Sequence, residues 1–131
     1  MELQLKFIGF ILMGLALVHA IFPKYFQWKQ ELQSLSLINR QLMYIHTFFI
    51  ALVVFLMGLL CATSALEMVT TAFGRKISLG LGFFWLCRLL IQFFGYSPAL
   101  WRGKAFETIV HIVFSLLWTY LSIVFIWIYL G

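Results

Sequence analysis

The chain contains little charge and no aspartate. Only 10% of its 131 residues are charged, whereas a typical soluble domain carries about 25% charged residues. A Ser-His pair would lack its usual orienting aspartate, and the sequence contains neither a GxSxG motif nor a phosphate-binding glycine loop. These absences give little support to serine hydrolases or to nucleotide-binding enzymes.

Cysteine and proline are equally scarce, with two residues of each. Cys61 and Cys87 lie far apart within apolar runs, form no CxxC pair and have no histidine at metal-ligand spacing. We interpret both as small, buried, apolar side chains. Pro23 follows the first apolar run. Because proline cannot donate a backbone hydrogen bond, we expect the first helix to stop there.

Hydrophobic residues dominate the rest, at 64% of the chain. A soluble domain of this length could not bury so much apolar surface, so the bilayer must act as the solvent. The formal charge of +5 does not indicate nucleic-acid binding, because most basic residues fall in short connections where they meet lipid headgroups. No basic folded domain is present. We expect membrane lipids, and no nucleic acid, as partners.

Four apolar stretches approach the length of about 20 residues that crosses a bilayer core. They cover approximately residues 5–22, 42–66, 77–96 and 105–130. We therefore predict an all-α integral membrane four-helix bundle that forms one transmembrane domain, residues 1–131. Apolar residues recur near helical spacing after the first span, which predicts a short interfacial helix or an extension of the second span.

The connections between spans also predict an orientation. Four spans place both termini on one side of the membrane. The first and third connections carry Lys24, Lys29, Arg40, Arg102 and Lys104, and the other side carries Lys6, Arg75 and Lys76. Cytoplasmic loops carry an excess of Lys and Arg, so we predict a multi-pass protein whose termini are not cytoplasmic.

Polar residues form one stripe on each of the last two spans. The fourth span carries Glu107, His111, Ser115, Trp118 and Ser122 at spacings of three or four, and the third carries Trp85, Arg88, Gln92 and Tyr96 at the same spacings. Such residues share one helix face. A charge that faced lipid would be costly, so we expect both stripes to face the bundle interior. For Gln92 we expect a hydrogen bond between helices.

The three histidines lie at comparable depth near one membrane face. His19 is near the end of the first span, whereas His46 and His111 are near the starts of the second and fourth. Alternating helix directions bring these three positions to the same side. Ionisable residues inside a membrane favour a functional site. The alternative is that three independent histidines each bond to headgroups or carbonyls at the interface.

Two cofactors suit such a site. A haem b could take His46 and His111 as axial ligands, with His19 as a substitute, and its propionates could pair with Arg40, Arg88 or Arg102. A single zinc or iron ion could instead be held by the set His19, His46, His111 and Glu107. The first hypothesis for function is therefore cofactor binding for redox, lipid or quinone chemistry.

The alternatives need no cofactor. Arg88, Arg102, Lys104 and the histidines could bind an anionic lipid headgroup or carry protons. The chain could also be an accessory or structural subunit of a larger membrane complex or of a homo-oligomer. The sequence does not indicate a reaction.

Overall fold

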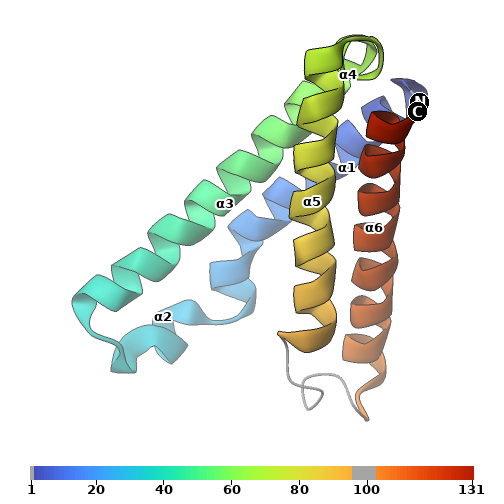
Figure 1. Ribbon diagram of the computed structural model, residues 1–131. Helices are drawn as coiled ribbons and strands as arrows, with labels where there is room; N and C mark the ends of the chain where they lie inside the picture. Colours follow the sequence, from blue (N-terminus) through green and yellow to red (C-terminus); the bar gives the residue numbers. More distant parts are fainter. Residues whose placement is uncertain (1, 96–102) are drawn as a thin grey trace. The chain divides into compact units, whose positions relative to one another are not determined.

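The computed structural model describes residues 2–95 and 103–131 (Figure 1). The described residues form helices and turns, without any strand. They divide into two compact units, Glu2–Ala65 and Leu66–Gly131. Each unit is an antiparallel hairpin of two long helices.

The first hairpin begins with α1, Glu2–Tyr25. Contrary to our expectation, this helix continues past Pro23. Pro23 has no N–H to donate to the preceding turn, but the residues after it keep the helical pattern, and Phe26 N–H donates to Phe22 O at 2.9 Å. The chain leaves the helix at Gln27, which adopts a left-handed φ of 54°.

The connection to the second long helix is mostly helical. It contains α2, Trp28–Glu31, and the 3-10 turn η1, Leu32–Ser34. Helix α3, Leu37–Thr63, then begins earlier than the predicted span, because the Ser36 side chain accepts from the backbone N–H of Asn39 at 3.4 Å and caps its first turn. Both predicted features, a short helix and an extended second span, are therefore present.

Two glycines allow α1 and α3 to pack closely. A Cβ built on Gly9 would lie 2.6 Å from the Gly58 carbonyl oxygen, and one built on Gly58 would lie 2.6 Å from the Gly9 carbonyl oxygen. The backbones of α1 and α3 are therefore in contact at Gly9 and Gly58. Leu5, Ile8 and Leu12 on the same side of α1 are fully buried.

The connection between the second and third predicted spans, residues 67–76, is also largely helical. It contains most of α4, Ala65–Thr70, and the start of α5, Ala72–Phe94. The Thr71 hydroxyl donates to Glu67 O at 2.7 Å and accepts from Gly74 N–H at 2.9 Å. It therefore ends one helix and caps the next. Gly74 is needed for a close approach, because its Cβ would collide with the Glu67 carbonyl.

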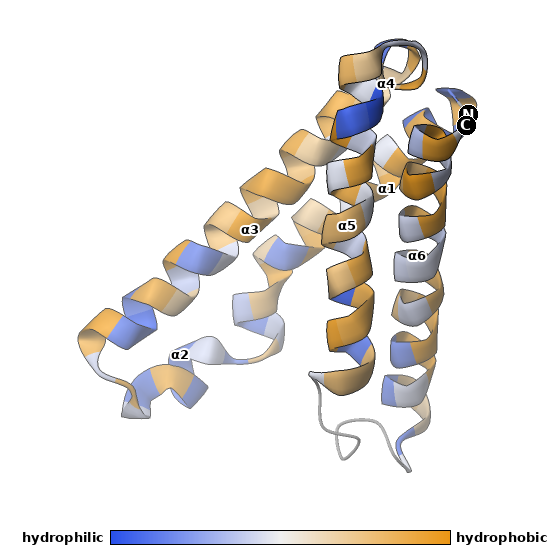
Figure 2. Cartoon of the chain, in the orientation of Figure 1, coloured by the Kyte–Doolittle hydropathy of each residue, from blue (hydrophilic) through white to orange (hydrophobic). Residues whose placement is uncertain are grey.

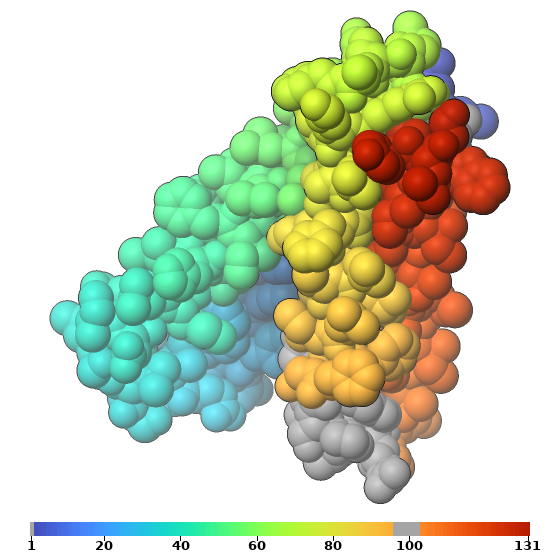
Figure 3. Space-filling view, in the orientation of Figure 1, coloured from blue at the N-terminus to red at the C-terminus, as the bar shows by residue number. Residues whose placement is uncertain are grey.

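The second hairpin pairs α5 with α6, Ala105–Leu130. Figure 3 shows their side chains, yellow and red, meeting along the pair. Leu121 and Phe125 of α6 are fully buried. A Cβ on Gly82 of α5 would lie 2.8 Å from the Ile126 side chain, so the absence of a side chain at Gly82 sets the approach of the two helices.

The four long helices α1, α3, α5 and α6 are each long and apolar enough to cross a membrane. Orange, apolar positions predominate on all four in Figure 2. Large hydrophobic side chains on them stay exposed, among them Phe10, Phe48, Phe83 and Leu116. Such surfaces suit lipid rather than water. The predicted all-α fold, with four candidate spans and a short helix between the first and second, is confirmed.

Candidate functional site

The two predicted polar stripes meet inside the α5/α6 hairpin. Gln92 of α5 bonds to two residues of α6, with its Nε2 2.8 Å from His111 Nδ1 and its Oε1 3.3 Å from Trp118 Nε1. Arg88 Nη1 donates to the same Gln92 Oε1 at 3.3 Å. The predicted interhelical role of Gln92 is confirmed. We call Trp85, Arg88, Gln92, His111 and Trp118 the polar centre.

Arg88 and His111 of the polar centre lie equally far from the neighbouring ends of their helices. Arg88 is six residues before the end of α5, and His111 is six residues after the start of α6. At 1.5 Å per residue, both lie about 9 Å along their helices. Gln92 is only 7% exposed and Trp118 only 3%. The antiparallel pairing of the helices therefore brings a cation, an amide and an imidazole together within an apolar surrounding.

The hydrogen bonds to Gln92 determine the tautomer of His111. Arg88 and the Trp118 indole can only donate, so the amide atom that faces both of them must be the oxygen. The amide nitrogen then faces His111 and donates to Nδ1. His111 Nδ1 therefore carries no hydrogen, and the neutral ring has its hydrogen on Nε2. Gln92 thus orients His111 as a hydrogen-bond donor through Nε2.

Aromatic rings enclose the centre. Trp85 of α5 stacks on Trp118 of α6 with ring centroids 5.0 Å apart and an interplanar angle of 11°. Phe114 stacks on the same Trp118 ring at 5.4 Å. The Arg88 guanidinium carbon lies 5.1 Å from the Trp118 ring centroid, within the range of a cation–π contact. These rings hold the guanidinium in place and reduce the space for water around it.

One buried donor of the centre has no acceptor. Trp85 is 2% exposed, and its indole Nε1 has no hydrogen-bond partner among the residues that the structure describes. Leaving a buried donor without a partner costs about 1–3 kcal/mol. Gln92 Oε1 cannot readily serve Trp85, because it already accepts two hydrogen bonds. The side chains of the centre therefore offer more donors than acceptors.

The other polar residues of the fourth-span stripe either bond to their own helix or are exposed. Ser115 Oγ donates to the His111 carbonyl at 2.7 Å, and Ser122 Oγ donates to the Trp118 carbonyl at 2.8 Å. These hydroxyls are satisfied by their own helix. Glu107, one turn before His111, is exposed. The expectation of an inward-facing stripe is therefore confirmed for His111 and Trp118, and it is wrong for Glu107.

The other histidines belong to the α1/α3 hairpin. His19 Nδ1 lies 2.9 Å from the Leu15 carbonyl oxygen. A carbonyl only accepts, so Nδ1 carries the hydrogen and Nε2 of the neutral ring keeps its lone pair. This is the tautomer in which metal-binding histidines usually occur. His46 is exposed on α3, and Arg40 of the same helix is half-buried.

The predicted site residues are thus divided between hairpins. Arg88, His111 and Glu107 belong to one unit, and His19, His46 and Arg40 belong to the other. Within the described part of each hairpin, no three His, Cys, Asp or Glu side chains gather as a metal site would require. Arg102 and Tyr96 lie outside the described residues. The haem and metal assignments stay predictions.

Sequence spacing alone did not reveal the role of Trp85. Its place in the third-span stripe put it on the correct face, but the unsatisfied indole depends on which acceptors its neighbours already occupy. Only coordinates provide that information.

No protein-family model, curated protein or solved structure matches the chain. The class of the protein therefore follows from its own features. Four candidate membrane spans define a multi-pass membrane protein, and the α5/α6 hairpin holds a polar centre rich in hydrogen-bond donors.

Proposed function

We propose that the polar centre binds the acidic oxygen headgroup of a membrane-soluble molecule, a carboxylate or a phosphate. The observation that carries the proposal is the buried indole N–H of Trp85, which has no acceptor among the described residues. A ligand oxygen would satisfy it. Because Arg88 is part of the same centre, a negatively charged oxygen suits the site better than a neutral one.

The surroundings support a ligand with an apolar body. Arg88 lies within a candidate span, where charged side chains mark ligand and ion pathways. Trp118 and Phe114 supply apolar surface beside the guanidinium. His111, oriented by Gln92, adds a polar ring to the same centre. This arrangement fits a lipid-soluble acid whose hydrocarbon part remains in the bilayer.

Binding of oleate to the protein in neutral detergent tests the proposal, with oleyl alcohol as the matched probe that lacks the carboxylate. Hydrogen bonds to charged groups contribute about 1.5–3 kcal/mol, so oleate should bind at least about tenfold more tightly than the alcohol. We expect Trp85→Phe and Arg88→Lys to remove most of that preference, as measured by native mass spectrometry. Trp28→Phe and Arg40→Lys, both on the other hairpin, are matched controls outside the centre and should keep it.

Equal binding of acid and alcohol would contradict the proposal. So would a preference for oleate that survives in both centre variants. A neutral ligand, such as a quinone, would instead show binding that depends on Trp85 but not on the charge at residue 88.

A cofactor site in the α1/α3 hairpin is the second candidate, and the tautomer of His19 favours it. His111 is a poorer ligand. A histidine that binds a metal through Nε2 carries its hydrogen on Nδ1, so Gln92 would have to turn its oxygen toward His111. Its NH₂ group would then face Arg88 and Trp118, which are themselves donors. The haem or metal hypothesis therefore centres on His19 and His46. An absorption spectrum and metal analysis of purified protein test it: a Soret band or bound zinc or iron should be lost in His19→Ala.

A further inference from the structure

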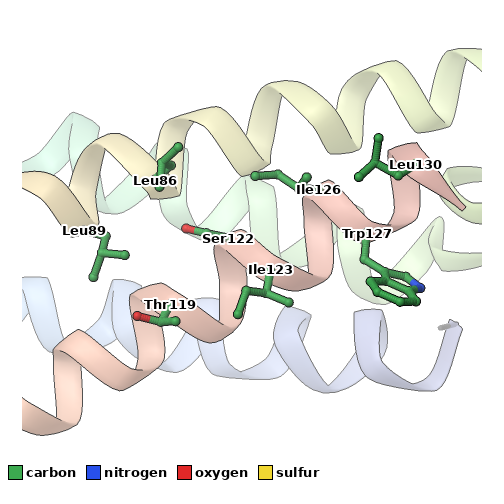
Figure 4. A pocket seen from close by; sticks show the side chains of 8 residues that line it. All are labelled: Leu86, Leu89, Thr119, Ser122, Ile123, Ile126, Trp127 and Leu130. Atoms are coloured by element: carbon green, nitrogen blue, oxygen red, sulfur yellow. The ribbon is translucent and has the colours of Figure 1, made fainter.

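A second feature of the α5/α6 hairpin begins beside the polar centre, at Leu86 and Leu89 of α5, and extends along α6 to Leu130. A groove of about 270 Å³ runs between the two helices. Figure 4 shows its lining, with two leucines from α5 and six residues from α6. The lining residues are Leu86, Leu89, Thr119, Ser122, Ile123, Ile126, Trp127 and Leu130.

The groove wall is effectively apolar. Its two hydroxyl groups donate to carbonyls of their own helix, Thr119 Oγ1 to Ser115 O and Ser122 Oγ to Trp118 O, both at 2.8 Å. They therefore do not require a polar ligand. The occupant must be a hydrocarbon.

The dimensions of the groove fit a hydrocarbon chain from one leaflet. On α6 the lining extends from Thr119 to Leu130, roughly 16 Å of helix at 1.5 Å per residue. One leaflet of a bilayer core is about 15 Å thick, half of roughly 30 Å. The small volume of the groove suits a single acyl chain better than a helix of a partner protein, which is about 10 Å across.

A cationic cavity adjoins the groove at the end where α6 terminates. This cavity has a volume of about 160 Å³ and is lined by Val69, Arg75, Trp127, Ile128 and Gly131. Trp127 lines both spaces. Arg75 donates there to two backbone oxygens, with Nε 3.3 Å from Val69 O and Nη2 3.5 Å from Gly131 O. These contacts use only part of a guanidinium that has five N–H donors.

We infer that this surface is a binding site for an anionic phospholipid, with one acyl chain in the α5/α6 groove and the phosphate at Arg75. Lys76, the next residue and exposed, adds positive charge at the same end. An apolar groove that ends beside Arg75 matches the shape and the charge of such a lipid. The inference does not depend on the proposed function of the polar centre.

Two paired substitutions test the inference on the full chain in neutral detergent. The probe is phosphatidylglycerol, compared with phosphatidylcholine of the same acyl chains, and bound lipid is counted by native mass spectrometry. Arg75→Gln should weaken phosphatidylglycerol binding about fivefold, since a basic residue near the surface contributes about a factor of that size. Arg40→Gln, on the other hairpin, is its control.

A bulky substitution in the groove tests whether an acyl chain binds there. Ile123→Trp should block the acyl chain and reduce binding of both lipids, whereas Ile109→Trp is the matched control outside the groove. The two isoleucines lie on the same helix and are 58% and 59% exposed. Unchanged lipid binding in Ile123→Trp would overturn the inference, and so would a phosphatidylglycerol preference that depends on Arg88 instead of Arg75.

A measurement in which Ile123 is unchanged guards against misfolding of Ile123→Trp. Phosphatidylglycerol with brominated acyl chains, added at a few per cent to phosphatidylcholine vesicles, should quench a fluorescence component that is absent in Trp127→Phe. Brominated phosphatidylcholine at the same level should quench it less. Equal quenching by both lipids would refute a site selective for the anionic headgroup.

Discussion

At the scale of single residues, Gln92 links the two helices of the second hairpin. Its oxygen accepts from Arg88 and Trp118, and its nitrogen donates to His111. An amide can do both in fixed directions without carrying a charge. A carboxylate here could not donate to His111 Nδ1 unless it were protonated. The glutamine therefore sets both the packing of the helices and the tautomer of the histidine.

Replacing Gln92 with leucine should destabilise the protein. Interhelical hydrogen bonds within membranes contribute about 0.6 kcal/mol each on average, and Gln92→Leu removes two of them. We expect the free energy of unfolding to fall by about 1–2 kcal/mol, measured by circular dichroism during titration with a denaturing detergent. Gln41→Leu, at an exposed position of α3, should change it by less than about 0.5 kcal/mol. Equal stability of the two variants would show that the network contributes nothing.

Part of the candidate site was predictable from spacing. The three- and four-residue intervals that contain Arg88 and His111 place each on the inner face of its helix, and the structure brings them to one centre. The tautomer of His111 was not predictable, because it depends on which way the Gln92 amide points. The exposure of Glu107 was missed because it lies only two residues inside α6, where the partner helix no longer covers it.

At the scale of elements, composition predicted the long helices better than their ends. Stretches of apolar residues near spanning length identify α1, α3, α5 and α6. The ends depend on local hydrogen bonds: Phe26 N–H extends α1 past Pro23, and Thr71 caps α5 five residues before the predicted span. Hydropathy contains no information about such hydrogen bonds, so the predicted span ends differ from the helix ends in the structure.

Glycines set the distance between helices, and a paired substitution measures this. In Gly9→Ala the new Cβ would lie 2.6 Å from the Gly58 carbonyl oxygen and 2.8 Å from Ala62 N. Backbone atoms cannot move aside singly, so α1 and α3 must separate, and overpacking of this kind costs about 1–3 kcal/mol. Gly14→Ala, whose Cβ meets nothing within 4 Å, should be neutral or stabilising by up to about 1 kcal/mol.

Thermal unfolding of the two variants in one detergent provides the measurement. The melting temperature of Gly9→Ala should fall below that of the natural sequence, and that of Gly14→Ala should not. If both variants melt alike, close contact at Gly9 does not determine the stability of this hairpin.

At the scale of the whole molecule, the chain consists of two antiparallel hairpins with different chemistry. The first packs through the glycines of α1 and α3 and carries His19 and His46. The second packs through Gly82 and carries the polar centre near one end and Arg75 near the other. In the two proposals, the ligand sites therefore lie near opposite ends of one hairpin, whose helix α5 is long enough to span a membrane.

The orientation of these faces is the last prediction. Five basic residues in the first and third connections against three on the other side predict that those connections are cytoplasmic and that both termini are outside. Single cysteines at Gln4→Cys, Gln33→Cys and Gly131→Cys test this in a background with Cys61→Ala and Cys87→Ala. A membrane-impermeant maleimide should label residues 4 and 131 in intact cells and residue 33 only after permeabilisation. The reverse pattern would invert the orientation and place the Arg75 site in the inner leaflet. Labelling of residues 4 and 131 from opposite sides would contradict four spans altogether.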